Sequence, residues 1–422
     1  MHNLFSIKKN SYISLLKENP EFVKLFLAQA LSRLGNQLHR FGFPWIVYDL
    51  TGSAKMMALN FSISLLPNLL FGIMGGVVAD RFHKKKVLIA GDLIAGILTF
   101  SIVLLNYNHL NIYYLFLFTF LLSTISAIYL PTFQSVLPSV VNKENIMNAN
   151  SFFSITNSFI NLTGPVIAGM IIGFWGPFIN ICINSFTFLL SAICVIGMQL
   201  KINNVEKKSH ENIVQSIKSS FAYIRGTSWL LRGLILNICV YLGAGSIGSL
   251  IQFYLRDILQ LSGKMIGVSF ALFEFLPMFL MGYLTPYICK KFNYEKVMMI
   301  GSFLYSISLI LLGFHLNYAL FILISMILNA SMVLLMITWQ TMWQEKTPNH
   351  LLGRISGTVL NAQFITFPLG GFIAAYLVNF LSIPLIIMIF GIIVFAALLT
   401  TYTFVRNPVL SEDSVKNITN IK

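Results

Sequence analysis

The chain has 422 residues, of which 10% are charged and 56% are apolar. A soluble domain of this length needs a larger polar surface, so the composition excludes an ordinary soluble protein and indicates a lipid environment. The net charge of +14 would suit a nucleic-acid-binding protein. The basic residues lie in short segments between apolar runs, however, so we expect no nucleic-acid partner.

Long apolar segments repeat along the chain, and a helix needs roughly 20 mostly apolar residues to cross a membrane. We expect spans at 22–48, 55–79, 86–106, 111–139, 149–174, 176–200, 229–255, 265–289, 295–314, 317–343, 354–378 and 383–405. The predicted fold is an all-α polytopic membrane protein with twelve transmembrane helices.

The Lys and Arg residues predict the orientation of these spans. With the N-terminus in the cytoplasm, 23 of them lie on the cytoplasmic side and three outside, while Arg33 and Arg40 lie within the first span. Cytoplasmic loops of membrane proteins are enriched in Lys and Arg. We therefore expect a protein of the bacterial cytoplasmic (inner) membrane with both termini in the cytoplasm.

Polar residues follow one side of the first span: Gln29, Arg33, Asn36, Gln37 and Arg40. At 100° per residue they lie within about 100° of arc. Ionisable side chains inside a membrane are costly and usually face a bundle interior. We predict that this stripe binds substrate, and that the two Arg residues attract an anionic group. The alternatives are pairing with an acid or extension towards a membrane interface.

Residues 76–86 form a basic segment between the second and third spans, with the sequence Gly-Val-Val-Ala-Asp-Arg-Phe-His-Lys-Lys-Lys. An Asp at a helix end can bind the positive N-terminus of another helix and hold one conformation by a breakable contact. We therefore predict a gating network, with a simple positively charged loop as the alternative. Its members are Gly76, Asp80, Arg81, Lys84, Lys85 and, in the third span, Asp92.

The longest polar stretch, 201–228, lies at the middle of the chain. Within it Ile213, Ile217, Phe221 and Ile224 recur at helical spacing, which predicts an amphipathic helix on the cytoplasmic membrane surface. A disordered linker is the alternative.

The two halves on either side of this stretch share residues at a displacement of 206. Residues 133–135 (Phe-Gln-Ser) fall on 339–341 (Trp-Gln-Thr), and Gly164 falls on Gly370. A parallel duplication of this kind predicts two six-helix pseudo-repeats around a central cavity. The predicted parts are a cytoplasmic arm (1–21), a first bundle (22–200), the cytoplasmic linker (201–228), a second bundle (229–405) and a cytoplasmic tail (406–422).

Glu274 is the one acid deep in an expected span, three residues before Pro277 in the eighth. A carboxylate at this depth must be protonated or paired with a cation, and switching between these states couples protons to transport. We predict a proton-coupling role, with a permanent ion pair to Arg33 or Arg40 as the alternative.

The segment at 76–86 resembles the major facilitator superfamily, whose 2–3 loop reads G-x-x-x-D-R-x-G-R/K-R/K, with His83 here in place of the second glycine. Residues 43–54 and 347–357 resemble the branch that includes macrolide-efflux pumps and enterobactin-type siderophore exporters. Gly164-Pro165 followed by Gly169 is similar to a motif of proton-driven exporters.

This resemblance implies transport by alternating access and adds residues to both predicted sites. The gating set gains Gly164, Pro165 and Arg354. The substrate-binding set gains residues on spans four, seven and ten: Gln134, Asn237, Tyr241, Asn329, Trp339 and Gln340.

The chain has no phosphate-binding loop and no Cys/His cluster with metal-ligand spacing, so we expect neither an enzyme nor a cofactor, and a proton gradient as the driving force. The predicted function is secondary active export, by proton antiport, of a small amphipathic molecule such as a siderophore or drug. We expect a monomer whose other contacts are membrane lipids. The alternatives are an importer or facilitator of a small organic anion, and a non-transporting lipid-handling or sensory component.

Overall fold

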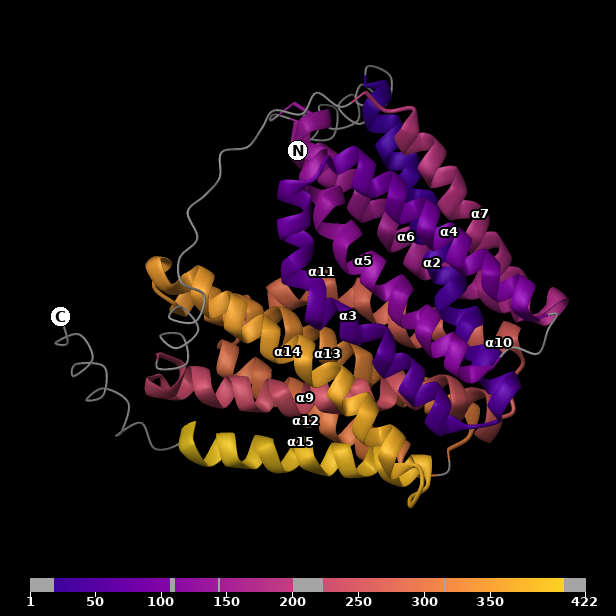
Figure 1. Cartoon of the computed structure of the whole chain (residues 1–422). Helices are drawn as coiled ribbons and strands as arrows, with labels where there is room; N and C mark the ends of the chain where they lie inside the picture. The colour runs from indigo at the N-terminus through magenta and orange to yellow at the C-terminus, as the bar shows by residue number, and fades with distance from the viewer. Residues whose placement is uncertain (1–18, 107–110, 143–144, 200–222, 315, 406–422) are drawn as a thin grey trace, which may run out of the picture. The chain divides into compact units, whose positions relative to one another are not determined.

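The computed structural model describes residues 19–106, 111–142, 145–199, 223–314 and 316–405, with backbone alone in a few helical stretches such as 73–81 and 352–354 (Figure 1). Every regular element in these ranges is helical. The helices before the middle of the chain are α2 (Pro20–Thr51), α3 (Ala54–Arg81), α4 (Lys84–Asn106), α5 (Ile112–Val140), α6 (Ile146–Trp175) and α7 (Pro177–Ile196).

The helices after the middle include two short π-helical turns, η2 and η3. In chain order they are α9 (Ser228–Phe253), η2 (Tyr254–Ile258), α10 (Gly263–Phe270), η3 (Ala271–Phe275), α11 (Leu276–Lys291), α12 (Tyr294–Leu312), α13 (Tyr318–Lys346), α14 (Asn349–Leu377) and α15 (Ile383–Val405). The predicted amphipathic helix falls largely in 200–222, outside the described residues.

Within the described ranges, eleven helical segments are long and apolar enough to cross a membrane. They correspond to the predicted spans from the second to the twelfth. The 32-residue α2 is long enough but is not among them, and its polar residues include Glu21, Lys24, Arg33 and Arg40. The helical, polytopic fold is confirmed, whereas the twelfth crossing and the two-repeat arrangement stay predictions.

Two compact units divide the chain. One unit comprises residues 1–207 together with 255–271, and the other comprises 208–254 together with 272–422. The segment Leu255–Ala271 therefore belongs to the first unit although it follows the middle of the chain. Each of its ends lies in a π-helical turn, η2 or η3. Such turns interrupt regular α-helical hydrogen bonding and frequently lie at functional positions.

Helices pair in the same order in each unit. In the first, α2 packs on α6 and α7, α3 on α5, and α4 on α5 and α7. In the second, α9 packs on α14 and α15, α11 on α13, and α12 on α13 and α15. Glycines permit the closest of these contacts, because a Cβ on Gly370 of α14 would lie 2.1 Å from the carbonyl oxygen of Leu242 on α9.

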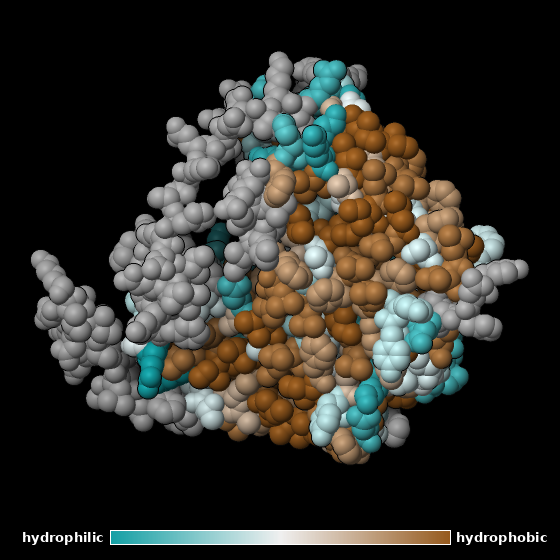
Figure 2. Space-filling view, in the orientation of Figure 1, coloured by the Kyte–Doolittle hydropathy of each residue, from teal (hydrophilic) through white to brown (hydrophobic). Residues whose placement is uncertain are grey.

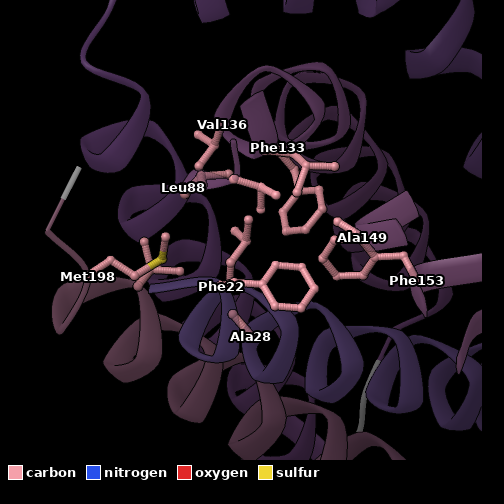
Figure 3. Close-up of a cluster of buried hydrophobic side chains, with 12 residues drawn as sticks. Phe22, Ala28, Leu88, Phe133, Val136, Ala149, Phe153 and Met198 are labelled. Carbon is pink, nitrogen blue, oxygen red and sulfur yellow. The ribbon is translucent and has the colours of Figure 1, made fainter. Parts of the chain in front are cut away.

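An apolar cluster fills one end of the first unit (Figure 3). The ring of Phe153 lies 5.7 Å from those of both Phe22 and Phe133, centroid to centroid. The cluster joins five helices and consists of Phe22, Leu25, Ala28, Leu88, Phe133, Val136, Leu137, Val141, Ala149, Phe153, Val195 and Met198.

The outer surface suits contact with lipid. Apolar side chains cover most of the coloured part of the face drawn in Figure 2, and the most hydrophilic residues lie mainly near its edges. Large side chains such as Phe174 and Trp175 are exposed. A soluble protein rarely leaves so much apolar surface in water, so a membrane environment follows from the surface as well as from helix length.

Candidate functional site

The polar stripe of α2 has an exposed part formed by Arg33, Asn36 and Arg40. These positions lie three and four residues apart, so they share one side of the helix. Leu38, Gly42 and other residues of the opposite side are buried. The guanidinium of Arg40 lies 6.0 Å from the ring centroid of Phe41. Three of the five predicted stripe residues therefore share one accessible face of α2, which we call the α2 polar face.

The other two stripe residues lie differently. Gln29 is half-buried. Gln37 is buried, and its Nε2 donates a hydrogen bond of 2.7 Å to Oδ1 of Asn161 on α6. Gly164 makes room for it, because a Cβ there would lie 2.9 Å from Cβ of Gln37. Gln37 thus joins α2 to α6, and a role for it in substrate binding remains a prediction.

Of the predicted residues on α9, Asn237 is buried and donates a hydrogen bond of 2.9 Å to the carbonyl oxygen of Gly233. Trp339 of α13 packs on the same glycine, whose Cβ would lie 2.2 Å from its ring. The indole nitrogen of Trp339 is buried and has no hydrogen-bond partner in the described part of the chain. These three residues form one contact inside the second unit.

The remaining predicted substrate-binding residues of α5, α9 and α13 form no described hydrogen bond with the residues of that contact. Tyr241 is half-buried, with its ring 6.3 Å from that of Phe367. Asn329 donates a hydrogen bond of 3.0 Å to the carbonyl oxygen of Ser325 one turn earlier. Gln134 and Gln340 are exposed on α5 and α13.

A charged contact that the sequence analysis missed joins the end of α2 to η2. The guanidinium of Arg256 lies 4.1 Å from the ring centroids of both Trp45 and Tyr48. It forms an ion pair with Asp49 and donates a hydrogen bond of 3.3 Å to the carbonyl oxygen of Trp45. The hydroxyl of Tyr48 donates a hydrogen bond to Asp257. We call this group the Arg256 contact.

A glycine contact joins α10 to α6 within the same unit. A Cβ on Gly267 would lie 2.3 Å from the carbonyl oxygen of Pro165, and a Cβ on Gly169 would lie 2.3 Å from that of Gly263. Backbone therefore touches backbone, and no larger side chain fits without separating the helices. Pro165 and Gly169 of the predicted exporter motif thus pack closely against Leu255–Ala271, whereas Gly164 packs on Gln37.

The two acids singled out from the sequence lie in different surroundings. Glu274 is half-buried within η3, between the buried Phe273 and Phe275. Asp92 of α4 is buried, and its Oδ2 accepts hydrogen bonds from Ser191 Oγ (2.7 Å) and the Tyr129 hydroxyl (3.2 Å).

Of the predicted gating residues, Lys84 and Lys85 bind backbone carbonyl oxygens of other helices, and those bound by Lys85 lie at the C-terminus of α7. Lys84 Nζ donates to the carbonyl oxygen of Ser135 at 3.1 Å, and Lys85 Nζ donates to those of Ile196 and Met198 at 2.8 and 2.7 Å. Cations near helix C-termini favour the helix dipole. Among the predicted gating residues, the side chains of Asp80, Arg81 and Arg354 lie outside the described part of the chain, and for Gly76 only its place in helix α3 is described.

Comparison with known proteins identifies relatives along almost the whole chain. A family model described as transmembrane secretion effector matches residues 13–419. Macrolide efflux protein A of Streptococcus pyogenes is 21% identical over 363 residues, which cover 84% of this chain and 88% of that protein. The staphyloferrin A transporter of Staphylococcus aureus is 19% identical over 306 residues, 72% of this chain and 76% of that protein.

Solved structures show the same fold. The nucleoside transporter NupG aligns with a TM-score of 0.76 at 11% identity, covering 91% of this chain and 98% of that one. A bacterial homologue of the iron transporter ferroportin, in an inward-facing state, aligns with a TM-score of 0.67 at 16% identity over 90% and 98%. The sequence-based resemblance to the major facilitator superfamily is confirmed, and these relatives are transporters rather than enzymes.

Proposed function

Because the chain belongs to the transmembrane secretion effector family of the major facilitator superfamily, and is therefore a multi-pass membrane transporter, we propose that it exports a small amphipathic molecule in exchange for protons. The α2 polar face carries this proposal. Exposure of two guanidinium groups of one helix to lipid would cost several kcal/mol. We therefore infer that Arg33 and Arg40 face an aqueous path. A substrate path is the reason for a transporter to keep them.

The charge of this face indicates the class of substrate. Residues 33–40 contain two Arg and no acid, and guanidinium groups bind carboxylates and other planar anions. An anionic amphipathic molecule, such as a carboxylate or catechol siderophore, fits this face better than a cationic drug. The names of two relatives, a staphyloferrin A transporter and a macrolide efflux protein, support a search among siderophores and macrolides.

The proposed cycle is alternating access between two six-helix repeats that make twelve crossings, with both termini in the cytoplasm of a bacterium. The Arg256 contact and the glycine contact hold Leu255–Ala271 on the first unit, and this segment continues through η2 and η3 into helices of the second. Release of the segment would accompany the change of access. Glu274 lies in η3, so its protonation would act where this segment ends.

The first experiment compares cells with and without the gene under iron limitation, measuring iron-chelating metabolites inside and outside. Loss from the medium with accumulation inside would establish siderophore export. An unchanged distribution would remove siderophores and direct the assay to macrolides, and uptake in place of loss would indicate an importer.

The second experiment tests the α2 polar face with the substrate so found. Arg33→Gln with Arg40→Gln should raise the KM for an anionic substrate by tenfold or more, because each charged hydrogen bond contributes about 1.5–3 kcal/mol. Lys86→Gln, which removes an exposed cation of α4 away from this face, is the matched control. Equal KM values in the double variant and the control would refute the assignment.

A further inference from the structure

A polar layer of three buried residues and one half-buried residue lies in the first unit, one helical turn from the apolar cluster. Each of its members is four residues from a cluster residue on the same helix, and so lies on the same side of that helix. The pairs are Ser32 with Ala28 on α2, Asp92 with Leu88 on α4, Tyr129 with Phe133 on α5, and Ser191 with Val195 on α7. We call these four polar residues the Asp92 layer.

The carboxyl group of Asp92 has neutral partners in this layer. The residue is 1% exposed, and the hydroxyls of Ser191 and Tyr129 both donate to the same oxygen, Oδ2. No ion pair joins Asp92 to a Lys or Arg among the described residues. This distinguishes it from Asp49 and Glu295, which are both ion-paired at the surface.

The helices packed against α4 bring no described cation to this carboxyl group. The titratable groups facing it are Tyr129 of α5 and Cys194 of α7, and both are neutral at physiological pH. From α2 comes Ser32, and α3 carries no charged residue between Met56 and Gly72. Lys84 and Lys85, on α4 itself, bind the backbone carbonyls of other helices.

An ionised carboxylate is costly to bury without a cation, whereas a protonated, hydrogen-bonded carboxyl group costs far less. The geometry accommodates both forms. Because both hydroxyl donors bind Oδ2, a proton can bind Oδ1 without breaking either hydrogen bond. The step is the addition of H⁺ from water to the carboxylate, and no other bond changes.

We propose that Asp92 is a proton-binding site of the transporter, loaded and discharged when the Asp92 layer opens to water. Asp92 would be a second proton-binding site beside Glu274. Only the use of this site in transport rests on the proposed proton exchange; the binding of a proton to Asp92 does not. The apolar cluster lies between this layer and the end of the unit that carries Lys24, Lys84 and Lys85. It would keep water from the carboxyl group on that side while the unit stays closed.

A merely structural role makes a different prediction. If Asp92 only ties α4 to α5 and α7, Asp92→Asn should be silent, since the amide oxygen accepts the same two hydrogen bonds. If Asp92 binds a proton, that variant has the shape of the protonated form and cannot discharge. The substitution therefore separates the two roles without removing the contacts.

The test is infrared difference spectroscopy of the purified full-length protein across a pH series. We expect a buried-carboxyl C=O band that titrates in the wild type, is absent in Asp92→Asn and is unchanged in Glu295→Gln, a control acid at the surface. Ser191→Ala should move the midpoint of that band up by about one pH unit, because it removes a donor that favours the charged form. The same titrating band in Asp92→Asn, or an unmoved midpoint in Ser191→Ala, would overturn the proposal.

A second measurement keeps this inference separate from the proposed function. Everted vesicles with an imposed pH gradient should accumulate an anionic siderophore or erythromycin, whichever the wild type transports, and Asp92→Asn should lower this accumulation to the gradient-free rate. Gradient-driven efflux at the wild-type rate in that variant would overturn the coupling role. If the wild type itself shows no gradient-driven efflux of erythromycin or of an anionic siderophore, the proposed function fails, while the infrared result still decides whether Asp92 binds a proton.

Discussion

The Arg256 contact supplies the sharpest prediction, because substitution of one residue removes several interactions. In Arg256→Ala the cation–π contacts with Trp45 and Tyr48, each 4.1 Å from ring centroid to guanidinium, are lost with the ion pair to Asp49. The two ring contacts contribute about 1–2 kcal/mol together. The ion pair adds only about 0.5 kcal/mol, since Asp49 is 41% exposed and well screened. The hydrogen bond to the Trp45 carbonyl adds about 0.5–1 kcal/mol.

The loss is therefore about 2–3.5 kcal/mol of attachment between η2 and α2, which corresponds to a roughly 30- to 300-fold shift towards release of Leu255–Ala271. Amide hydrogen exchange measures this directly, because local opening sets the exchange rate of protected amides. We expect amides of α10 to exchange faster by up to that factor in Arg256→Ala. Exchange elsewhere in the first unit should change little.

Lys346→Ala is the matched control. Lys346 also combines an exposed ion pair, to Glu295, with a cation–π contact, 5.4 Å from the ring of Trp229, but it lies in the second unit. It should leave exchange in Leu255–Ala271 at the wild-type rate. Unchanged protection of α10 in Arg256→Ala, or an equal effect of both variants, would refute the view that this contact holds the segment.

Three further predictions follow from the same elements. Gly267→Leu should separate α10 from Pro165, because even a Cβ would lie 2.3 Å from that carbonyl oxygen, and should raise α10 exchange more than Leu272→Ala at an exposed position. Glu274→Gln should abolish the dependence of transport on a pH gradient while substrate exchange persists, and unchanged dependence would remove Glu274 from the coupling. Asp80→Asn should slow turnover while equilibrium binding of the substrate stays the same, and normal turnover would contradict the gating assignment.

The helices could be predicted from the sequence because length and hydropathy are local properties. The eleven apolar segments meet the requirement for a membrane helix without reference to any partner. Helix α2 shows the limit of this reasoning. The sequence predicts α2 as a span, but Arg33 and Arg40 lower its hydropathy, and α2 is not among the eleven segments that length and hydropathy identify.

The contacts of Leu255–Ala271 could not be predicted in this way. Arg256 lies 211 residues from Trp45, and no periodicity links positions so far apart. The signals were present as separate local patterns: Trp45, Tyr48 and Asp49 at helical spacing, and a G-x-x-x-G pair at Gly263 and Gly267. Only the packing in the structure shows that η2 contacts the first pattern, on α2, and that the glycine pair of α10 contacts α6.

The position of Asp92 shows why the same residue can be interpreted in two ways. In the sequence it follows the basic segment at 84–86 closely, which favours a role beside those cations. In the helix it lies two turns beyond Lys84, and one turn beyond the buried Leu88, so the apolar cluster separates its carboxyl group from the basic end. An acid and a cation that are close in the sequence interact weakly when the rise of the helix and its packing place apolar side chains between them. An acid that is buried one turn past such a cluster, and whose described partners are all hydroxyls, is suited to exchange a proton rather than to hold an ion pair.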